Sequence, residues 1–344
     1  MQLPTALHNE TELDELLSRP SPLVLETAQR LESDLLILGV GGKMGPTLAR
    51  MAARALAEVG SPHRVIGVAR FSQPALPAQL TAWGVTPLAC DLLDRQTLAT
   101  LPDCRHVIFM AGQKFGTSGQ SARTWAMNSY MPALVAERFT QANVVVFSTG
   151  NVYPLTPVAQ GGSLESDTPN PVGEYAMSCL GRERIFEHFA LTQGLRCAIM
   201  RLNYAIDLRY GVLLDIAQRV YSGQPIDLSM GNANVIWQGD ANAQALALLD
   251  HCSTPPFVLN VTGPETVSVR RVAEVMGRLL AQEPHFVGQE APTALLSNAA
   301  KAQQLFGYPS VSLQQMIEWT VAWVKNERVV WNKPTHFEAR DGKF

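Results

Sequence analysis

The chain has 344 residues, 47% of them hydrophobic, and a formal net charge of −3 at pH 7. This length predicts one large domain or two medium ones. The near-neutral charge, without a long basic run, argues against nucleic acid or a membrane surface as partners. No apolar stretch approaches the ~20 residues that cross a bilayer. The polar N-terminus does not fit a signal peptide.

Residues 1–33 are expected to form a helical extension. Leu13, Leu16 and Leu17 follow a helical spacing, and Pro20 and Pro22 then interrupt it. A second short helix is expected before residue 33.

Short apolar strands then alternate with helices. Strands are expected at 35–38, 65–68, 86–89, 107–110, 144–147 and 195–201, and helices at 46–59, 122–141 and 173–192. These strands are rich in Val, Ile and Leu on both faces, as buried parallel strands are. The pattern predicts an α/β fold with a Rossmann-type, doubly wound parallel sheet in a dinucleotide-binding domain over 34–202.

The regular alternation ends near residue 203. Residues 203–325 are expected to form a smaller, mixed α/β lobe that binds substrate at the C-terminal edge of the sheet. Its helices are expected at 211–222, 240–251, 269–281, 299–306 and 313–325, and its strands at 225–228, 257–261 and 285–287. Residues 326–344 are expected to be an extended tail, lying across the surface or on a neighbouring subunit.

A glycine-dense turn follows the first strand, with the spacing Gly39-x-x-Gly42-x-x-Gly45. Such a turn lets phosphates approach the backbone at a helix N-terminus, where unpaired N–H groups attract anions. The sequence departs from G-x-G-x-x-G because Met44 stands at the position of the third glycine. A plain tight turn is the alternative, but the strand before and the helix after it favour a dinucleotide. Gly39, Gly42, Lys43, Met44 and Gly45 are therefore predicted cofactor residues, although Lys43 could face solvent.

Other candidates follow the later strands, because ligands bind at the carboxyl ends of parallel strands. Arg70 ends the second strand, where it suits the 2′-phosphate of NADP, unless it is simply solvated. Asp91, followed by Leu92, could accept from the adenine amine or cap a helix. Ala111 and Gly112 are small enough to let a cofactor pass. We therefore expect NADP, with NAD as the alternative.

Tyr175 lies in the first turns of a predicted helix that follows Asn170 and Pro171. A tyrosine there can act as an acid or base on a substrate hydroxyl. Its unperturbed pKa of ~10 means that it needs a stabilising charge near neutral pH. The alternative is a packed aromatic side chain.

In order and spacing, the motifs over residues 34–325 resemble the extended short-chain dehydrogenase/reductase family of nucleotide-sugar epimerases and dehydratases. The resemblance includes the glycine turn, Asp91-Leu92, Ala111-Gly112, Asn128, Ser-Thr-x-x-Val-Tyr at 148–153, Asn-Pro…Tyr at 170–175 and Gly239-Asp240. It implies a nicotinamide cofactor, a hydride exchanged with a sugar carbon, Thr149 bonded to the reacting hydroxyl and Tyr175 carrying its proton. Asn151, Asn203 and Arg209 are expected to bind substrate.

The chain departs from this family at Cys179, where the Tyr-x-x-x-Lys motif has lysine. A neutral thiol cannot lower the tyrosine pKa as an ammonium does, and a thiolate would raise it. We hypothesise that Lys114 supplies the missing cation, although it could be a surface lysine. Arg182, two helical turns beyond Tyr175, is expected to be a poor substitute.

Two functions remain open on the sequence. The first is an NAD(P)-dependent oxidoreductase or epimerase acting on a sugar, sugar acid or nucleotide sugar. The second is a non-catalytic NAD(P)-binding sensor or scaffold of the same fold, which Cys179 favours. The five cysteines and seven histidines are scattered without a C-x-x-C pair, which indicates a reducing, cytoplasmic location and no metal site. A homodimer through the helices at 122–141 and 173–192 is also expected.

Overall fold

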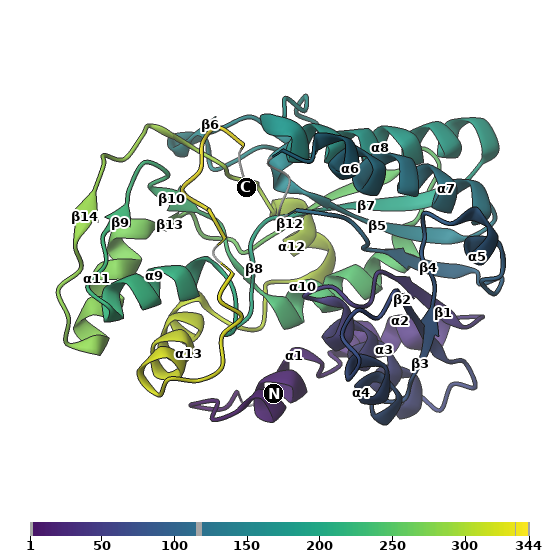
Figure 1. The fold of residues 1–344 in the computed structure, drawn as a ribbon, viewed down its shortest axis with the longest axis horizontal. Coiled ribbons are helices and arrows are strands. Elements are labelled where there is room, and N and C mark those ends of the chain that lie inside the picture. Colours follow the sequence, from purple (N-terminus) through teal and green to yellow (C-terminus); the bar gives the residue numbers. More distant parts are fainter. Residues whose placement is uncertain (1–2, 115–118, 334, 343–344) are drawn as a thin grey trace.

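A parallel sheet forms the middle layer of the larger part of the molecule, at the right of Figure 1. The computed structural model describes residues 3–114, 119–333 and 335–342. Within these ranges the sheet has seven strands in the order β12-β7-β5-β4-β1-β2-β3. They are β1 (Leu35–Leu38), β2 (Val65–Ala69), β3 (Val85–Ala89), β4 (His106–Phe109), β5 (Asn143–Thr149), β7 (Arg196–Leu202) and β12 (Phe257–Val261). The predicted doubly wound α/β fold is confirmed.

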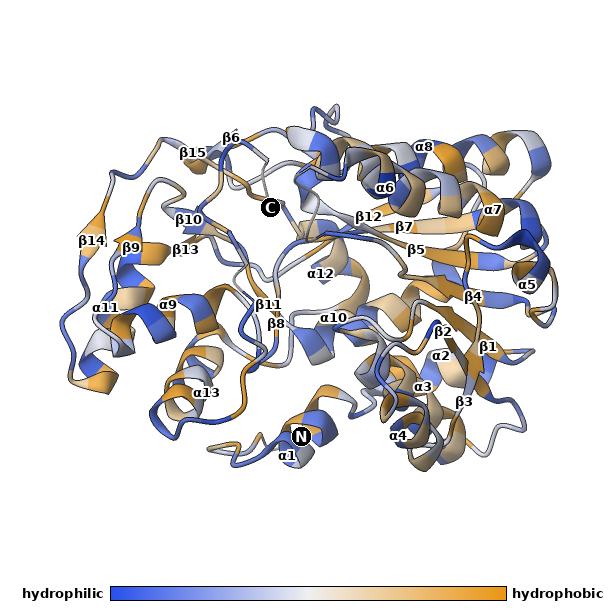
Figure 2. Ribbon diagram, in the orientation of Figure 1, coloured by the Kyte–Doolittle hydropathy of each residue, from blue (hydrophilic) through white to orange (hydrophobic). Residues whose placement is uncertain are grey.

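Helices cover both faces of this sheet. One face carries α2 (Pro22–Arg30), α3 (Gly45–Glu58), α4 (Leu76–Ala82), α10 (Gln238–Ala247) and α12 (Ala300–Phe306), and the other α5 (Arg95–Ala99), α7 (Met131–Arg138) and α8 (Gly173–Gln193). Alternate residues of β1 enter the two cores, with Leu35 and Ile37 on the first face and Leu36 and Leu38 on the second. Burial on both faces explains the continuous apolar strands in Figure 2.

The strand order fixes where a ligand can bind. β1 pairs in parallel with β2 on one side and β4 on the other, so the chain winds in opposite directions from this point. At such a switch point the connections diverge and leave a crevice beyond the strand ends. The glycine turn after β1 and residues 110–114 after β4 border this crevice.

Two sequence predictions differ from the structure. Residues 257–261, expected in the lobe, form an edge strand of the central sheet, where Val261 lies opposite Leu202. A five-residue apolar run does not specify which sheet it joins. The single helix expected at 122–141 is instead α6 (Ser121–Trp125), a π-helical turn (Ala126–Tyr130) and α7, and the helical segment ends at Arg138.

The smaller lobe packs three helices around its own core: α9 (Val212–Tyr221), α11 (Val269–Leu280) and α13 (Leu313–Lys325). Pairs of two-residue strands join its loops: β8 (Ala205–Ile206) with β11 (Ile236–Trp237), β9 (Ile226–Asp227) with β14 (Phe286–Val287), β10 (Asn232–Ala233) with β13 (Val267–Ser268), and β6 (Thr156–Pro157) with β15 (Thr293–Ala294). No helix of the described ranges has the length and apolarity needed to cross a membrane.

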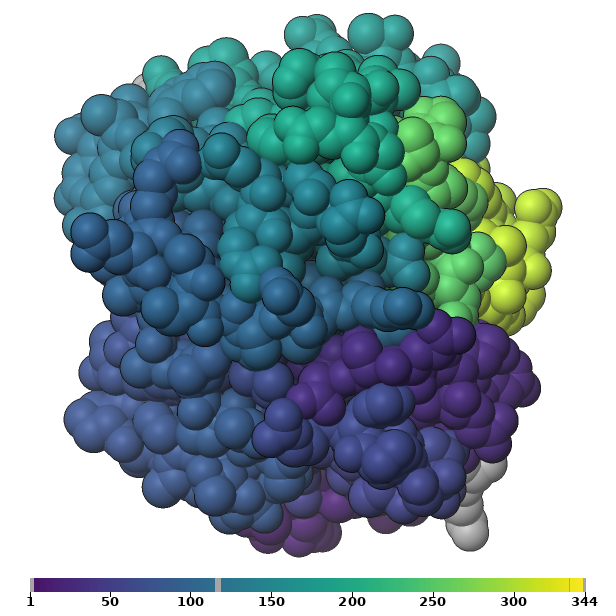
Figure 3. Space-filling view, turned by 90° about the vertical axis from the view of Figure 1, so that its right-hand side faces the viewer, coloured from purple at the N-terminus to yellow at the C-terminus, as the bar shows by residue number. Residues whose placement is uncertain are grey.

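Both ends of the chain pack into this lobe. Helix α1 (Glu10–Leu17) buries its leucines in the lobe core, and Phe337 from the C-terminal tail enters the same core. Further along the tail, Arg340 donates to the carbonyl of Thr293 at 2.8 Å. In Figure 3 the purple N-terminal residues form a continuous surface with the blue residues that follow them. The contacts of Phe337 and Arg340 place the C-terminal tail against its own chain.

Candidate active site

The glycine turn is shaped by close backbone contacts. Gly39 has a φ of +97°, and a Cβ there would lie 2.6 Å from the backbone nitrogen of Ala111. Gly45 packs against the carbonyl of Val40, so the turn leaves no room for a side chain at this position. Gly42 differs, because a Cβ there would meet only the carbonyl of Gly39, at 3.5 Å. Space thus remains above Gly42, where a phosphate could approach.

The first turn of α3 is open to an anion. Its N-cap, Met44, makes no side-chain capping bond. The helix therefore begins without a side chain that satisfies its first N–H groups, and the positive end of its dipole faces the crevice. These features fit the pyrophosphate of a dinucleotide.

A cavity of about 260 Å³ lies beside this turn and gathers most of the predicted cofactor residues. Its lining includes Gly39, Gly42, Arg70, Asp91, Leu92, Ala111 and Gly112. Asp91 accepts the N–H of Leu93 at 3.1 Å, whereas α5 is capped by Asp94. The alternative of Asp91 as a helix cap is therefore wrong, and its carboxylate borders the cavity.

A larger cavity of about 1020 Å³ lies between the sheet and the lobe. It gathers eight further predicted site residues: Lys43, Met44, Lys114, Thr149, Asn151, Tyr175, Asn203 and Arg209. Gly45 lines neither cavity. The C-terminal tail adds Trp331, Lys333 and Thr335 to its lining, which the sequence reasoning missed. Nothing in the tail's composition identifies these residues, because only the fold carries them to the cavity.

Tyr175, Thr149 and Cys179 form one contact group at the floor of this cavity. The Tyr175 hydroxyl interacts with the side chains of Thr149 and Cys179, and both affect its pKa. Burial raises the pKa of Tyr175 well above its usual value, and Cys179 raises it further. Burial likewise raises the pKa of the Cys179 thiol. Both groups therefore hold their protons at neutral pH.

Arg182 is a buried cation beneath this group. Its guanidinium donates to the carbonyl of Phe147 at 2.6 Å and to Oδ1 of Asn128 at 3.0 Å. Its charge lowers the pKa of Tyr175, against the larger effect of burial. The two-turn spacing predicted a poor substitute, but side chains on a helix lean toward its N-terminus, here toward Tyr175.

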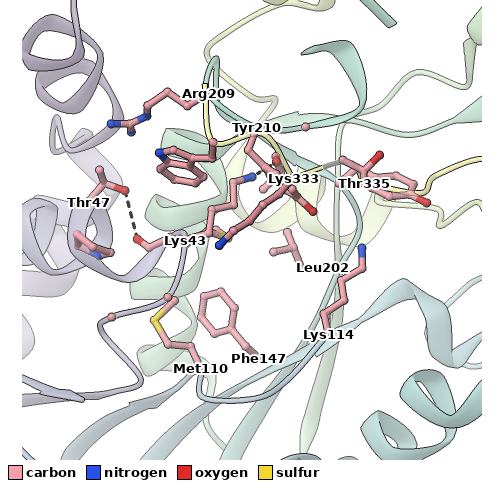
Figure 4. Close-up of a pocket in the computed structure, with 18 of the residues that line it drawn as sticks. Lys43, Thr47, Met110, Lys114, Phe147, Leu202, Arg209, Tyr210, Lys333 and Thr335 are labelled. Atoms are coloured by element: carbon pink, nitrogen blue, oxygen red, sulfur yellow. Dashed lines mark hydrogen bonds between the residues drawn. The ribbon is translucent and has the colours of Figure 1, made fainter. Parts of the chain in front are cut away.

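Three lysines line the large cavity (Figure 4): Lys43 in the glycine turn, Lys114 after β4 and Lys333 in the C-terminal tail. Lys43 leaves the glycine turn and donates to the carbonyl of Ala205 in the lobe at 2.6 Å. Lys114, after β4, places its amine 5.9 Å from the Tyr204 ring centre. Burial lowers the pKa of Lys43 to about 7 and that of Lys114 to about 8.

The predicted substrate residues make internal contacts as well. Asn151 donates its side-chain amide to Thr149 at 3.1 Å, and so orients that hydroxyl. The Arg209 guanidinium donates to Asp207 at 2.8 Å and to Asp14 at 2.9 Å. Arg209 borders the cavity with its charge already matched by carboxylates of the protein.

This geometry defines the class of protein: an α/β fold of the dinucleotide-binding type, with a second lobe over its crevice. Residues 35–228 match the NAD dependent epimerase/dehydratase family. The match covers more than half of the chain, so the chain belongs to that family. No curated protein matches the sequence.

Solved structures share this fold at low sequence identity. UDP-glucuronic acid 4-epimerase from Bacillus cereus, in complex with UDP-glucuronic acid and NAD, is 17% identical with a TM-score of 0.69, covering 86% of this chain and 99% of its own. UDP-glucose 4-epimerase from Thermotoga maritima, with UDP-glucose, is 18% identical with a TM-score of 0.68 and the same coverage. The dTDP-glucose 4,6-dehydratase DesIV from Streptomyces venezuelae, with NAD bound, is 19% identical with a TM-score of 0.71, covering 85% and 97%.

Proposed function

We propose that this protein is an NAD(P)-dependent oxidoreductase or epimerase that acts on a sugar, sugar acid or nucleotide sugar. The observation that carries the proposal is the Tyr175–Thr149 contact at the floor of a cavity that also receives the glycine turn. The uncapped start of α3 and the open space at Gly42 would hold the pyrophosphate of the cofactor. When bound, this cofactor accepts or supplies the hydride.

Residues of the chain would orient the reacting hydroxyl and transfer its proton. Thr149, held by Asn151, would orient the reacting hydroxyl, and Tyr175 would exchange its proton. Because the pKa of Tyr175 is raised, its phenolate needs nearby positive charge. Arg182 supplies part of this charge from below, and we propose that Lys114 supplies more from the cavity. With a pKa of about 8, Lys114 is mostly protonated at pH 7.

Turnover with a panel of sugars tests the proposal. The absorbance of the reduced nicotinamide is followed with NAD or NADP, and an epimerase product is detected by chromatography. Tyr175→Phe is expected to lower kcat by roughly 10²-fold or more while cofactor binding stays unchanged. Lys114→Met is expected to lower kcat, whereas Lys325→Met, at an exposed position on α13, serves as the control. Full turnover by Lys114→Met would remove this lysine from the proton transfer.

The second candidate is a non-catalytic NAD(P)-binding sensor or scaffold. Cys179 favours it, because the buried thiol stands where the family motif has a cation. This candidate predicts tight cofactor binding without turnover of any sugar. The same assays separate the two functions, since only the enzyme depends on Tyr175.

We further propose that the cofactor is NADP. Arg70 is exposed and borders the smaller cavity, where its guanidinium could form a bidentate pair with a 2′-phosphate. The Kd for NADP is then expected to be lower than that for NAD, and Arg70→Ser to remove the difference. Equal or tighter binding of NAD would contradict this assignment.

A homodimer and a cytoplasmic location complete the proposal. Large apolar side chains are exposed on neighbouring helices: Trp125, Tyr130, Met177 and Leu191. Their burial by a second copy would be measured by sedimentation. The five cysteines form no disulfide, which supports a reducing compartment.

A further inference from the structure

The chain leaves β7 through a strained backbone conformation at Tyr204. This residue has a φ of +41°, in the left-handed region that aromatic residues rarely adopt. In an extended strand, successive side chains point to opposite faces. Beyond β7 this alternation is broken, because the consecutive residues Asn203, Tyr204 and Ala205 all line the large cavity. The turn of the backbone therefore brings an aromatic side chain into the site.

Hydrogen bonds on both sides of Tyr204 hold this conformation. The N–H of Asn203 donates to the carbonyl of Val261 at 3.0 Å, and the carbonyl of Asn203 accepts the hydroxyl of Thr262 at 3.0 Å. The carbonyl of Tyr204 itself accepts the N–H of Ile236 at 3.2 Å. A strained residue persists only where its surroundings fix it, and such residues gather at functional sites. The strain thus points to a role for the Tyr204 side chain.

The ring of Tyr204 is anchored, whereas its hydroxyl is not. The half-buried ring packs against the lobe core. Across the residues that the structure describes, no group forms a hydrogen bond with the hydroxyl, and the oxygen is not enclosed by protein atoms, so it is open to the cavity. The hydroxyl of Tyr153, by contrast, accepts from Arg201 at 2.7 Å and donates to Asn260 at 2.9 Å. A fixed ring that presents an unused hydroxyl is suited to binding a ligand.

The surrounding charges favour a neutral partner for this hydroxyl. Burial raises the pKa of Tyr204, and the carboxylates of Glu338 and Asp215 raise it further, so the phenol keeps its proton at neutral pH. The same two negative charges disfavour an anion beside the Tyr204 oxygen. A protonated phenol both donates and accepts hydrogen bonds, as a sugar hydroxyl does. A sugar hydroxyl therefore matches the Tyr204 oxygen better than a carboxylate or a phosphate.

Tyr204 also lies near the proposed reacting centre. Thr149, at the end of β5, pairs with Leu202 of β7, and Tyr204 follows Leu202 by two residues. Two residues of chain span at most about 7 Å, so a single bound sugar can reach both side chains. The two strand ends also remain in contact beyond their pairing, since a Cβ at Gly150 would lie 3.2 Å from Cγ of Asn203.

We propose that Tyr204 is a substrate-binding residue whose hydroxyl forms a hydrogen bond with one hydroxyl group of the sugar. The inference rests on the proposed function, because it assigns a contact to the same substrate. Proton transfer stays with Tyr175 and Thr149, and Tyr204 selects among sugars. A sugar without the matching hydroxyl gives the phenol no partner in place of the water that it displaces, so it binds less tightly.

Tyr204→Phe tests the contact, because it removes the hydroxyl and keeps the ring. Isothermal titration calorimetry of the full chain, saturated with NAD or NADP, gives the Kd for UDP-glucose, D-glucuronate and D-glucose. We expect Tyr204→Phe to weaken the best-bound of these probes by roughly 3- to 10-fold, as the loss of one neutral hydrogen bond does. Tyr308→Phe, at a side chain that is 74% exposed, should keep the wild-type Kd and serves as the control.

Thermal unfolding distinguishes a binding role from a structural one. Because the Tyr204 hydroxyl has no partner among the described residues, Tyr204→Phe should leave Tm within about 1 °C of the wild type. Tyr153→Phe instead takes a partner from both Arg201 and Asn260, so it should lower Tm by roughly 2–5 °C. The two variants make the same chemical change and differ only in whether the lost hydroxyl is bonded within the protein.

Monodeoxy analogues of the best-bound probe, each lacking one sugar hydroxyl, identify the group that Tyr204 recognises. The wild type should bind one analogue roughly 3- to 10-fold less tightly than the parent sugar because the contact is lost. Tyr204→Phe should bind that analogue and the parent equally, while it still discriminates against analogues that lack other recognised hydroxyls. Loss of discrimination at a single position is the signature of a direct pair, since only groups in contact are coupled.

The outcomes separate this inference from the proposed function. Wild-type affinity for the best-bound probe in Tyr204→Phe, or unchanged discrimination among the analogues, would overturn the contact while leaving the enzyme intact. A fall in Tm for Tyr204→Phe as large as that for Tyr153→Phe would also overturn it, because the hydroxyl would then have a partner within the protein. Failure of the cofactor-saturated wild type to bind any sugar would instead overturn the proposed function, and this contact with it.

Discussion

Two alanine substitutions in the glycine turn should separate folding from cofactor binding. A Cβ at Gly39 would lie 2.6 Å from the nitrogen and 2.7 Å from the Cα of Ala111, whereas ordinary contact begins at 3.4 Å. The positive φ of +97° adds a conformational cost of about 1–2 kcal/mol. At Gly42 φ is not positive, and a Cβ meets one oxygen at 3.5 Å.

The expected magnitudes follow from these distances. Gly39→Ala must displace the backbone that follows β4, because neither atom it meets belongs to a flexible side chain, and we expect a loss of about 3 kcal/mol or more in the free energy of unfolding. For a chain of this length that corresponds to a fall in Tm of roughly 5 °C. Gly42→Ala is expected to change Tm by no more than about 1 °C, because a new methyl group there overlaps nothing.

The two variants are distinguished by measuring both thermal stability and cofactor affinity. Calorimetry gives Tm, and quenching of protein fluorescence gives the Kd for NADH and NADPH. Gly42→Ala should keep its Tm and bind cofactor at least 10-fold more weakly, since the methyl group occupies the space left for the pyrophosphate. Wild-type affinity in Gly42→Ala would refute this placement of the cofactor, and an unchanged Tm in Gly39→Ala would refute the close approach to Ala111.

Three further predictions concern the interior. Phe337→Ala should cost about 3–5 kcal/mol in urea denaturation, because Phe337 is 1% exposed in the lobe core, whereas Val329→Ala, 54% exposed in the same tail, should cost less than about 0.5 kcal/mol. Glu183→Gln should cost about 3–5 kcal/mol, because it leaves the Arg201 guanidinium buried without its counter-charge, and adding Arg201→Met should recover part of the loss. All five cysteines are buried, so a thiol reagent at pH 8 should label none in the native protein and five in guanidinium chloride. Labelling of Cys179 in the native protein would contradict this and show that the cavity floor opens.

Much of the central fold could be predicted because its signal is local. Each of the first six sheet strands is a short apolar run that follows a turn, and the glycines mark where the first strand ends. The sequence could not show that residues 257–261 join the same sheet, because pairing between distant segments leaves no local pattern. The lobe strands of two residues are shorter than any periodicity can reveal.

The residues of the candidate site likewise divide into those that the sequence located and those that it did not. Residues at strand ends, such as Thr149 and Gly112, are placed by the fold itself, so their order in the sequence located them. Arg182 was expected to lie too far from Tyr175 because helical spacing describes Cα positions and ignores the length and lean of a side chain. Trp331 and Thr335 escaped because the course of the tail depends on tertiary contacts such as the bond from Thr335 to Asp215.

The packing of Leu13 and Phe337 in one core constrains the order in which the parts of the protein can fold. Leu13 is synthesised long before Phe337, yet both belong to one core. All seven sheet strands have been synthesised by residue 261, so the sheet can form during translation, as N-terminal units generally do. The lobe core, and with it the wall of the large cavity, can be completed only after Phe337 has been synthesised. Newly made chains should therefore acquire the cofactor crevice before they can retain a substrate.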